Sequence, residues 1–306
     1  MPLATPPPKP IGRLVDIGGR SLHLHCRGGG APTVVIETGL GDFSFDWTLV
    51  QSRVERFARV CSYDRAGYAW SDVGPSPRTF DQLNLELHDA LARAGERRPF
   101  VLVGHSFGGG PVRRYVERYR EESAGLVLVD VIGEDQYIRM GPTAGRIRDG
   151  AKGVAIPNPV SMFSPPPRAS FTKPVAVEPP YDRLPAKERA LHGWAASLPE
   201  WEKAEDEQKQ WSAEYYARWS AASQDSRFGA LPLLVLARAS GGYPDNLNVP
   251  AAELERTRLD AQRALARLST VGAMRLVDAG HNMHLEAPDE VERAIRTVID
   301  LARAGR

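Results

Sequence analysis

The chain has 306 residues, of which 42% are hydrophobic and 25% are charged, as is typical of a soluble globular protein with a full apolar core. The formal net charge of +1 gives no reason to expect a nucleic-acid or membrane surface. No apolar run is long enough to span a bilayer, and the length suits one large domain with an insertion.

Residues 1–10 are rich in proline and predict a flexible tail. They lack the apolar stretch of a secretion signal, so we expect a cytoplasmic location. Residues 13–17 and 21–25 flank a glycine pair and predict a hairpin. His23 and His25 alternate onto one face of its second strand. We expect them to face solvent rather than to bind a metal ion, because no third ligand accompanies them.

The two cysteines, Cys26 and Cys61, are too few to form a disulfide framework. A bridge between them is the alternative, but structural disulfides belong to oxidising compartments. We therefore expect two free thiols, with Cys61 packed inside a strand.

A third strand is predicted at residues 32–37 and a fourth at 59–63, with a helix over 47–57 between them. Asp42 precedes this helix, and we expect it only to cap the helix. Asp64 and Arg65 follow the fourth strand. We expect them to form a structural ion pair, because buried charges persist mainly when they are paired.

The strongest motif is Gly104-His105-Ser106-Phe107-Gly108, which lies between a predicted buried strand (99–103) and an amphipathic helix (109–119). Small residues let the chain reverse so tightly that the Ser106 hydroxyl points outward. Unpaired N–H groups at the start of the helix favour negative charge there. The alternative is a glycine-rich helix start with an incidental serine, but the context favours a nucleophile.

The motif and its context resemble those of the α/β-hydrolases of the serine-hydrolase branch. The resemblance implies an eight-stranded, mostly parallel sheet with helices on both faces. It implies a core of residues 11–130 and 230–306, with a helical lid, residues 131–229, inserted after the sixth strand. It also implies that the backbone N–H groups of Leu40 and Phe107 bind an oxyanion. The family often has His-Gly before Leu40, where this chain has Thr-Gly.

The predicted lid has two halves. Many prolines exclude long helices from the first half. In the second half, aromatic spacing predicts two helices joined by the polar run 203–210. The first carries Trp194 and Trp201, and the second carries Trp211 and Trp219. Their aromatic faces would give the lid a core and an underside for apolar acyl or aryl groups.

Further strands are predicted at 231–237 and 274–277, with a helix over 252–268 between them. His281 follows the last strand in a Gly-His pair and is the predicted base that activates Ser106. His284 is its rival, but it lies further into the turn. We do not expect the two histidines to bind a metal ion, since no carboxylate or cysteine stands beside them at ligand spacing.

The acid that would orient this base is less certain than the base itself. Asp130 directly follows the sixth strand (125–129) and is the favoured candidate. Asp245 lies beyond a glycine pair after the seventh strand and is the alternative, with Glu134 as a third choice.

These residues predict a serine hydrolase that cleaves a carboxylic ester of a small to medium apolar acyl or aryl group. An amidase or a carbon–carbon bond hydrolase would use the same residues, and a non-catalytic binding protein would retain the fold. Epoxide hydrolases resemble this fold but need a carboxylate where Ser106 stands. We expect a small-molecule substrate, with no metal, nucleotide or flavin cofactor. The glycine run 28–30 lies between strands and opens no helix, so it is no dinucleotide loop.

Overall fold

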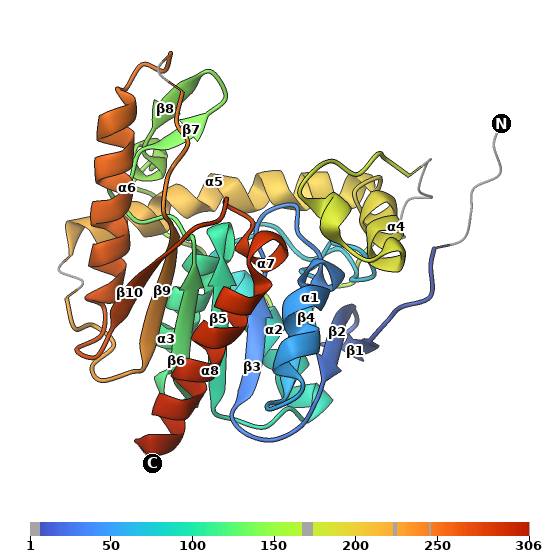
Figure 1. Cartoon of the computed structure of the whole chain (residues 1–306). Helices are drawn as coiled ribbons and strands as arrows, with labels where there is room; N and C mark the ends of the chain where they lie inside the picture. The colour runs from blue at the N-terminus through green and yellow to red at the C-terminus, as the bar shows by residue number, and fades with distance from the viewer. Residues whose placement is uncertain (1–6, 167–173, 223–224, 245, 306) are drawn as a thin grey trace.

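The computed structural model describes residues 7–166, 174–222, 225–244 and 246–305 (Figure 1). Residues 1–6 of the predicted tail lie outside these ranges. The rest of the tail contacts the body, because the Trp70 indole donates a hydrogen bond to the carbonyl of Pro8 over 2.6 Å.

One eight-stranded sheet organises the chain, and its strands follow the order β1-β2-β4-β3-β5-β6-β9-β10. β2 is antiparallel to both of its neighbours, and the remaining pairs are parallel. The predicted α/β-hydrolase architecture is confirmed. The strands are β1 (Arg13–Asp16), β2 (Ser21–Arg27), β3 (Thr33–Glu37), β4 (Val60–Tyr63), β5 (Phe100–His105), β6 (Ser123–Val129), β9 (Leu233–Arg238) and β10 (Ala273–Val277).

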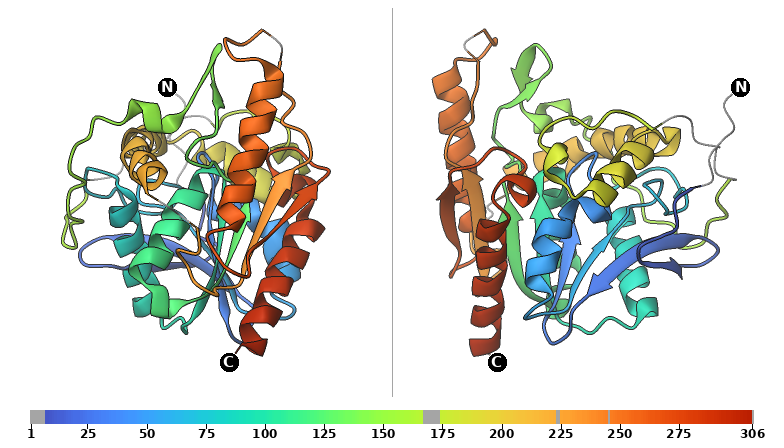
Figure 2. Two further views of the ribbon diagram at one scale, coloured as in Figure 1. Left: turned by 90° about the vertical axis from the view of Figure 1, so that its left-hand side faces the viewer. Right: turned by 45° about the vertical axis from the view of Figure 1, so that its right-hand side comes forward.

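Helices cover both faces of this sheet, as Figure 2 shows in its left view. The helices α1 (Thr48–Val54) and α8 (Pro288–Ala304) pack on one face. The helices α2 (Phe80–Ala94), α3 (Gly109–Arg118) and α6 (Ala251–Ala266) pack on the other. Short helices complete the core, namely η1 (Ser44–Trp47), η2 (Ser106–Gly108), η3 (Arg120–Glu122) and α7 (Met283–Glu286).

The central strands are apolar on both faces because each face meets a helix layer. In β5, Val101 and Val103 pack with α1 and α8, whereas Phe100 and Leu102 pack with α2 and α3. Side chains alternate along a strand, so a continuous apolar run supplies both layers. This burial holds the carboxyl end of β5 rigidly at the centre of the sheet.

The segment between β6 and β9, residues 131–229, is called the middle segment here. It contains a small hairpin of β7 (Ile138–Met140) and β8 (Thr143–Gly145), which was not predicted. After it come η4 (Ile147–Gly150), η5 (Tyr181–Arg183), α4 (Ala186–Ala195) and α5 (Pro199–Ala221). α5 crosses over the carboxyl ends of the parallel strands (Figure 1).

The predicted helix boundaries in this segment are wrong. Trp194 belongs to α4, whereas Trp201, Trp211 and Trp219 all belong to the single helix α5. Pro199 occupies the first turn of α5, a position that proline favours, so it begins a new helix between Trp194 and Trp201. The polar run 203–210 consists mainly of strong helix formers and continues the helix.

The two cysteines form a disulfide, so the expectation of free thiols is wrong. Cys26 of β2 and Cys61 of β4 stand directly opposite each other, with their Cα atoms 4.0 Å apart. The sequence did not reveal that β2 lies beside β4. Such bridges are typical of oxidising compartments, so this one does not support the expected cytoplasmic location. No described helix combines the length and the apolar character needed to cross a membrane.

The expectations for His23, Asp64 and Arg65 are also wrong. His23 is fully buried, and its Nδ1 lies 2.7 Å from the Asp64 carboxylate. Arg65 instead pairs with Glu37, with 2.8 Å between Nη1 and Oε1. Asp64 and Arg65 therefore do not pair with each other. Asp64 contacts His23 of β2, and Arg65 pairs with Glu37 of β3.

Candidate active site

The Gly-x-Ser-x-Gly segment forms a sharp turn between β5 and α3. Ser106 has a φ angle of +51°, which places it in the left-handed region that residues other than glycine rarely adopt. A Cβ atom on Gly104 would lie 2.8 Å from the carbonyl oxygen of Gly108, and one on Gly108 would lie 2.4 Å from that of Glu37. The turn therefore needs glycine at both positions.

The structure brings Ser106, His281 and Asp130 together. The Ser106 Oγ lies 2.9 Å from Nε2 of His281, and Nδ1 of His281 lies 2.7 Å from Oδ2 of Asp130. The hydroxyl donates to Nε2 when Nδ1–H donates to the carboxylate. The three residues come from the turn after β5, the loop after β10 and the end of β6. They are thus assembled at neighbouring strand ends.

Asp130 is held in its charged form. Burial opposes ionisation of this carboxyl group, but the hydrogen bond from His281 and the positive charge of Arg238 outweigh it and lower its pKa. The backbone N–H of Arg238 also donates to Asp130 Oδ1 over 3.2 Å. An ionised carboxylate here can fix the tautomer of His281.

The rival residues that the structure describes, Glu134 and His284, do not make these contacts. Glu134 forms an ion pair with Arg113, and Asp245 lies outside the part of the chain that the structure describes. The ring of His284 is buried and stacks on Trp47 at a centroid distance of 4.8 Å.

Asp42 is not simply a helix cap, and that expectation is wrong. It is 1% exposed, and its Oδ2 accepts a hydrogen bond from the backbone N–H of Gly39 over 3.1 Å. Nδ1 of His105 lies 3.1 Å from the same oxygen. The other carboxylate oxygen accepts from the hydroxyl of Tyr181, in η5. Asp42 therefore joins the predicted oxyanion turn, the nucleophile turn and the middle segment.

His105, which precedes the nucleophile, was missed by the sequence analysis. Its second nitrogen, Nε2, lies 3.0 Å from the backbone carbonyl oxygen of His281. Both ring nitrogens thus face oxygen acceptors, and the ring donates to both of them when it is an imidazolium. Burial opposes this charge, but the hydrogen bond and charge of Asp42 outweigh it and raise the pKa of His105.

Leu40 and Phe107, the predicted oxyanion donors, lie beside Ser106 on the wall of one cavity. Arg65 braces the turn that carries Leu40, since its guanidinium donates to the carbonyl oxygens of Thr38 over 2.8 Å and Gly39 over 2.6 Å. The role of the Leu40 and Phe107 backbone N–H groups as oxyanion donors stays a prediction.

That cavity measures about 720 Å³ and reaches from Ser106 to α5 and the β7–β8 hairpin. Its lining is mostly apolar, as in small-molecule sites. The lining residues are Leu40, Ser106, Phe107, Ile132, Ile138, Arg139, Met140, Ile147, Gly150, Lys152, Lys209, Gln210, Ser212, Ala213 and Tyr216. A second cavity of about 580 Å³, near Arg78 and Lys203, does not include Ser106 or His281 in its lining.

Two groups of described residues bring three potential metal donors together. Asp42, His105 and His284 place donor atoms within 4.8 Å of one another. A His105 ring that donates from both nitrogens has no lone pair for a metal ion. In the other group, Cys26 and Cys61 are joined in the disulfide. Hydrogen bonding and the disulfide thus account for both groups.

A sequence profile of the alpha/beta hydrolase family matches residues 22–294, and the chain belongs to this family. The chain is 34% identical over 135 residues to the probable transporter efuK of Hormonema carpetanum, a match that covers 42% of this chain and 19% of that protein. It spans between 19% and 46% of the length of three curated relatives that it matches.

Solved structures share the fold over nearly the whole chain. A serine hydrolase involved in carbazole degradation (the CarC enzyme) has a TM-score of 0.63 at 18% identity, covering 95% of this chain and 99% of that one. A thermophilic esterase from Thermogutta terrifontis has a TM-score of 0.61 at 18% identity, covering 92% and 94%.

Proposed function

We propose that this protein is a serine hydrolase that cleaves a carboxylic ester of a small to medium apolar acyl or aryl group. The observation that carries the proposal is the hydrogen-bonded chain Ser106–His281–Asp130 opening onto a mostly apolar cavity. A serine hydroxyl is a poor nucleophile unless a base lies within hydrogen-bond reach and a third group orients that base. The contacts of His281 with Ser106 Oγ and with Asp130 support this assignment, because they have the geometry of such a base and such an orienting group.

In the proposed reaction, Ser106 Oγ attacks the ester carbonyl carbon while Nε2 of His281 takes its proton. Asp130 keeps the Nδ1–H of His281 in place and stabilises the imidazolium that forms. The imidazolium then returns the proton to the leaving alcohol, which leaves an acyl-enzyme. His281 next removes a proton from water as the water oxygen attacks the acyl carbon. The imidazolium then returns this proton to Ser106 Oγ as the acyl–Oγ bond breaks, and the acid is released.

Charge develops on the carbonyl oxygen in both steps, and the backbone N–H groups of Leu40 and Phe107 would bind it. The loss of one such donor typically costs about 3 kcal/mol of transition-state stabilisation. The Arg65 contacts to the Leu40 turn support this assignment because a donor must be held in place before charge develops.

The middle segment would act as the lid of this site. α5 contributes a wall of the cavity and packs its buried residues Tyr215, Tyr216 and Trp219 against Phe80 and Phe107. These aromatic rings form a core for the segment, and two of them, Tyr216 and Phe107, also border the space for an apolar group. The serine hydrolase and the esterase of similar fold make ester hydrolysis the first activity to test.

Active-site labelling and turnover test the proposal together. A fluorophosphonate probe should label Ser106, and p-nitrophenyl esters of rising chain length should be hydrolysed faster than p-nitroanilides. Ser106→Ala should abolish labelling and lower kcat by roughly 10⁶-fold if the three residues act as a unit. Ser52→Ala is a matched control, because this hydroxyl bonds to Leu49 on α1, away from the cavity.

Faster cleavage of anilides would favour an amidase. Turnover of a substrate with a cleavable carbon–carbon bond, and of no ester or anilide, would favour a carbon–carbon bond hydrolase. Absence of labelling and of turnover would indicate a binding protein and contradict the proposal.

A further inference from the structure

The cavity beside Ser106 carries an excess of positive charge at its mouth. Arg139, Lys152 and Lys209 line it, and no aspartate or glutamate is among its described lining residues. A site for a wholly apolar ester needs no cation.

One face of α5 shows how this charge is placed relative to Ser106. Ser212, Ala213 and Tyr216 lie three, four and seven residues after Lys209, so all four share the helix face that lines the cavity. Tyr216 is 2% exposed and packs with Phe107, whereas the side chain of Lys209 is 49% exposed. The face therefore runs from the buried end beside the nucleophile turn to the mouth. Seven residues of helix separate these ends by about 10 Å.

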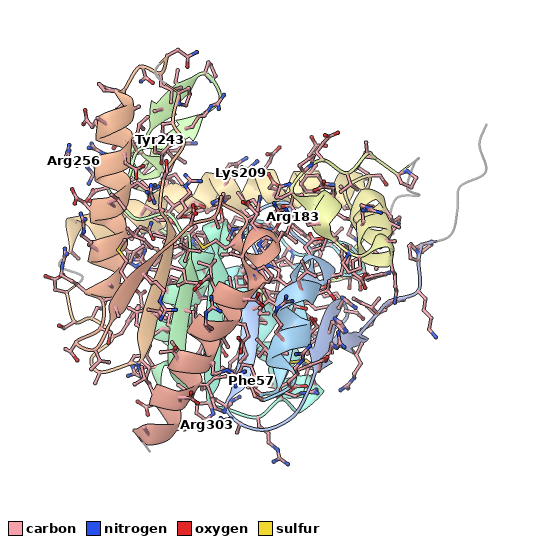
Figure 3. The ribbon with its side chains drawn as sticks, in the orientation of Figure 1. Phe57, Arg183, Lys209, Tyr243, Arg256 and Arg303 are labelled. Atoms are coloured by element: carbon pink, nitrogen blue, oxygen red, sulfur yellow. A yellow bond between two sulfur atoms is a disulfide. The ribbon has the colours of Figure 1, made fainter. Side chains whose placement is uncertain are left out.

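Lys209, which Figure 3 labels on α5, does not account for the excess of positive charge at the mouth of the cavity. Its ammonium group lies 2.5 Å from the Glu205 carboxylate and 3.5 Å from that of Asp206. These partners on the same helix neutralise its charge.

Lys152 and Arg139 carry the uncompensated charge. The backbone N–H of Lys152 donates to Glu214 of α5 over 2.7 Å, which fixes this part of the chain beside α5. Its exposed ammonium group has no carboxylate within ion-pair distance in the described chain, and neither has the guanidinium of Arg139. Glu214 is 5% exposed and does not line the cavity, so its charge is not presented to a bound molecule.

We propose that the cavity binds esters whose acyl chain ends in an anionic group, such as half-esters of dicarboxylic acids, with the terminal carboxylate at Lys152 and Arg139. The inference rests on the proposed function, because it places the ester carbonyl at Ser106. The apolar walls between Ser106 and the mouth would bind the methylene chain.

The test compares p-nitrophenyl half-esters of dicarboxylic acids with p-nitrophenyl alkanoates of equal chain length. Wild-type protein should show a lower KM for the half-ester, and Lys152→Met should raise that KM about fivefold while leaving the KM of the neutral ester unchanged. Arg139→Met should act in the same direction. The preference should weaken as salt is added, because the cations are exposed.

Lys187→Met is the matched control, since Lys187 is an exposed lysine of α4 that does not line the cavity. Equal KM values for charged and neutral esters in wild-type protein, or an equal effect of Lys152→Met on both, would overturn the inference.

A binding measurement separates this inference from the proposed function. Ser106→Ala should bind an alkyl half-ester by calorimetry, and Lys152→Met in the same background should weaken that binding about fivefold. If it does so while wild-type protein hydrolyses no ester, the anion site stands and the proposed function is wrong. If neutral esters are hydrolysed but half-esters are neither preferred nor bound through Lys152, the proposed function stands and the anion site is wrong.

Discussion

Asp130 and His281 illustrate what single residues reveal before a structure is known. Each directly follows a predicted strand, and parallel strands end at the same edge of a sheet, so their proximity to Ser106 could be expected. The sequence favours Asp130, because Asp245 lies later after its strand and beyond a glycine pair, but it leaves both candidates open. The 2.7 Å contact with His281 selects Asp130 among the described residues.

We expect Asp130→Asn to lower kcat by about 10³- to 10⁴-fold with little change in KM. The amide would no longer hold the tautomer of His281 or stabilise its imidazolium. Steady-state kinetics with the best p-nitrophenyl ester would measure the loss, and Asp245→Asn is the informative comparison. A large loss in Asp245→Asn together with a normal Asp130→Asn enzyme would show that the acid is misassigned.

Other residues could not be placed in advance because their partners are distant in sequence. His23 and His105 resembled ordinary strand residues, yet each contacts a buried carboxylate, Asp64 or Asp42. Residue type alone does not tell a solvated histidine from a buried one, since the difference depends on which loop covers it. The sequence signal for the His105 contact is the short polar loop that holds Asp42. A polar residue before a helix equally predicts a helix cap, so the loop alone does not reveal the contact.

At the scale of elements, the strands were predictable and the middle segment was not. β3, β5 and β6 are continuous apolar runs because helices cover both of their faces. By contrast, α5 mixes aromatic and charged residues, and its burial depends on crossing the strand ends. Its apolar periodicity is therefore interrupted by the polar run 203–210. For this reason the sequence predicts two helices joined by that run, where the structure has the single helix α5.

The disulfide that joins β2 to β4 leads to a prediction about stability at this scale. Cys26 and Cys61 are separated by 35 residues, and closing a loop of that size lowers the entropy of the unfolded chain. We expect the double variant Cys26→Ser, Cys61→Ser to lose about 2–4 kcal/mol in its free energy of unfolding. Urea unfolding would measure the change.

A reductant should destabilise the wild-type protein by a similar amount and leave the double variant unaffected. Equal unfolding midpoints for wild-type protein with and without reductant would count against the bridge.

At the scale of the whole molecule, one buried histidine, His284, contributes to the response to acid. His284 is fully buried, and burial lowers its pKa to about 3, helped by the charges of His105 and His281 and opposed by Asp42. The unfolded chain takes up a proton near the ordinary value of 6.5, whereas the folded chain does not. The contribution of His284 to stability is therefore complete above pH 6.5 and is lost progressively as the pH drops from 6.5 towards 3.

At pH 5 this one group should cost about 2 kcal/mol of unfolding free energy relative to neutral pH. His284→Phe keeps an aromatic ring against Trp47 and removes the titration. We expect the variant to lose about 2 kcal/mol less than wild-type protein between pH 7 and pH 5, as measured by urea unfolding at each pH. Parallel pH profiles would contradict this account.

The carboxylate of Asp42 links the middle segment to the active-site turns. One of its oxygens receives the hydroxyl of Tyr181, and the other receives the Gly39 amide and the ring of His105. Any outward swing of the chain around Tyr181 would strip this anion of one of its three donors and alter the field felt by the other two. The middle segment, the turn that carries Leu40 and the turn that carries Ser106 are therefore coupled through one buried carboxylate.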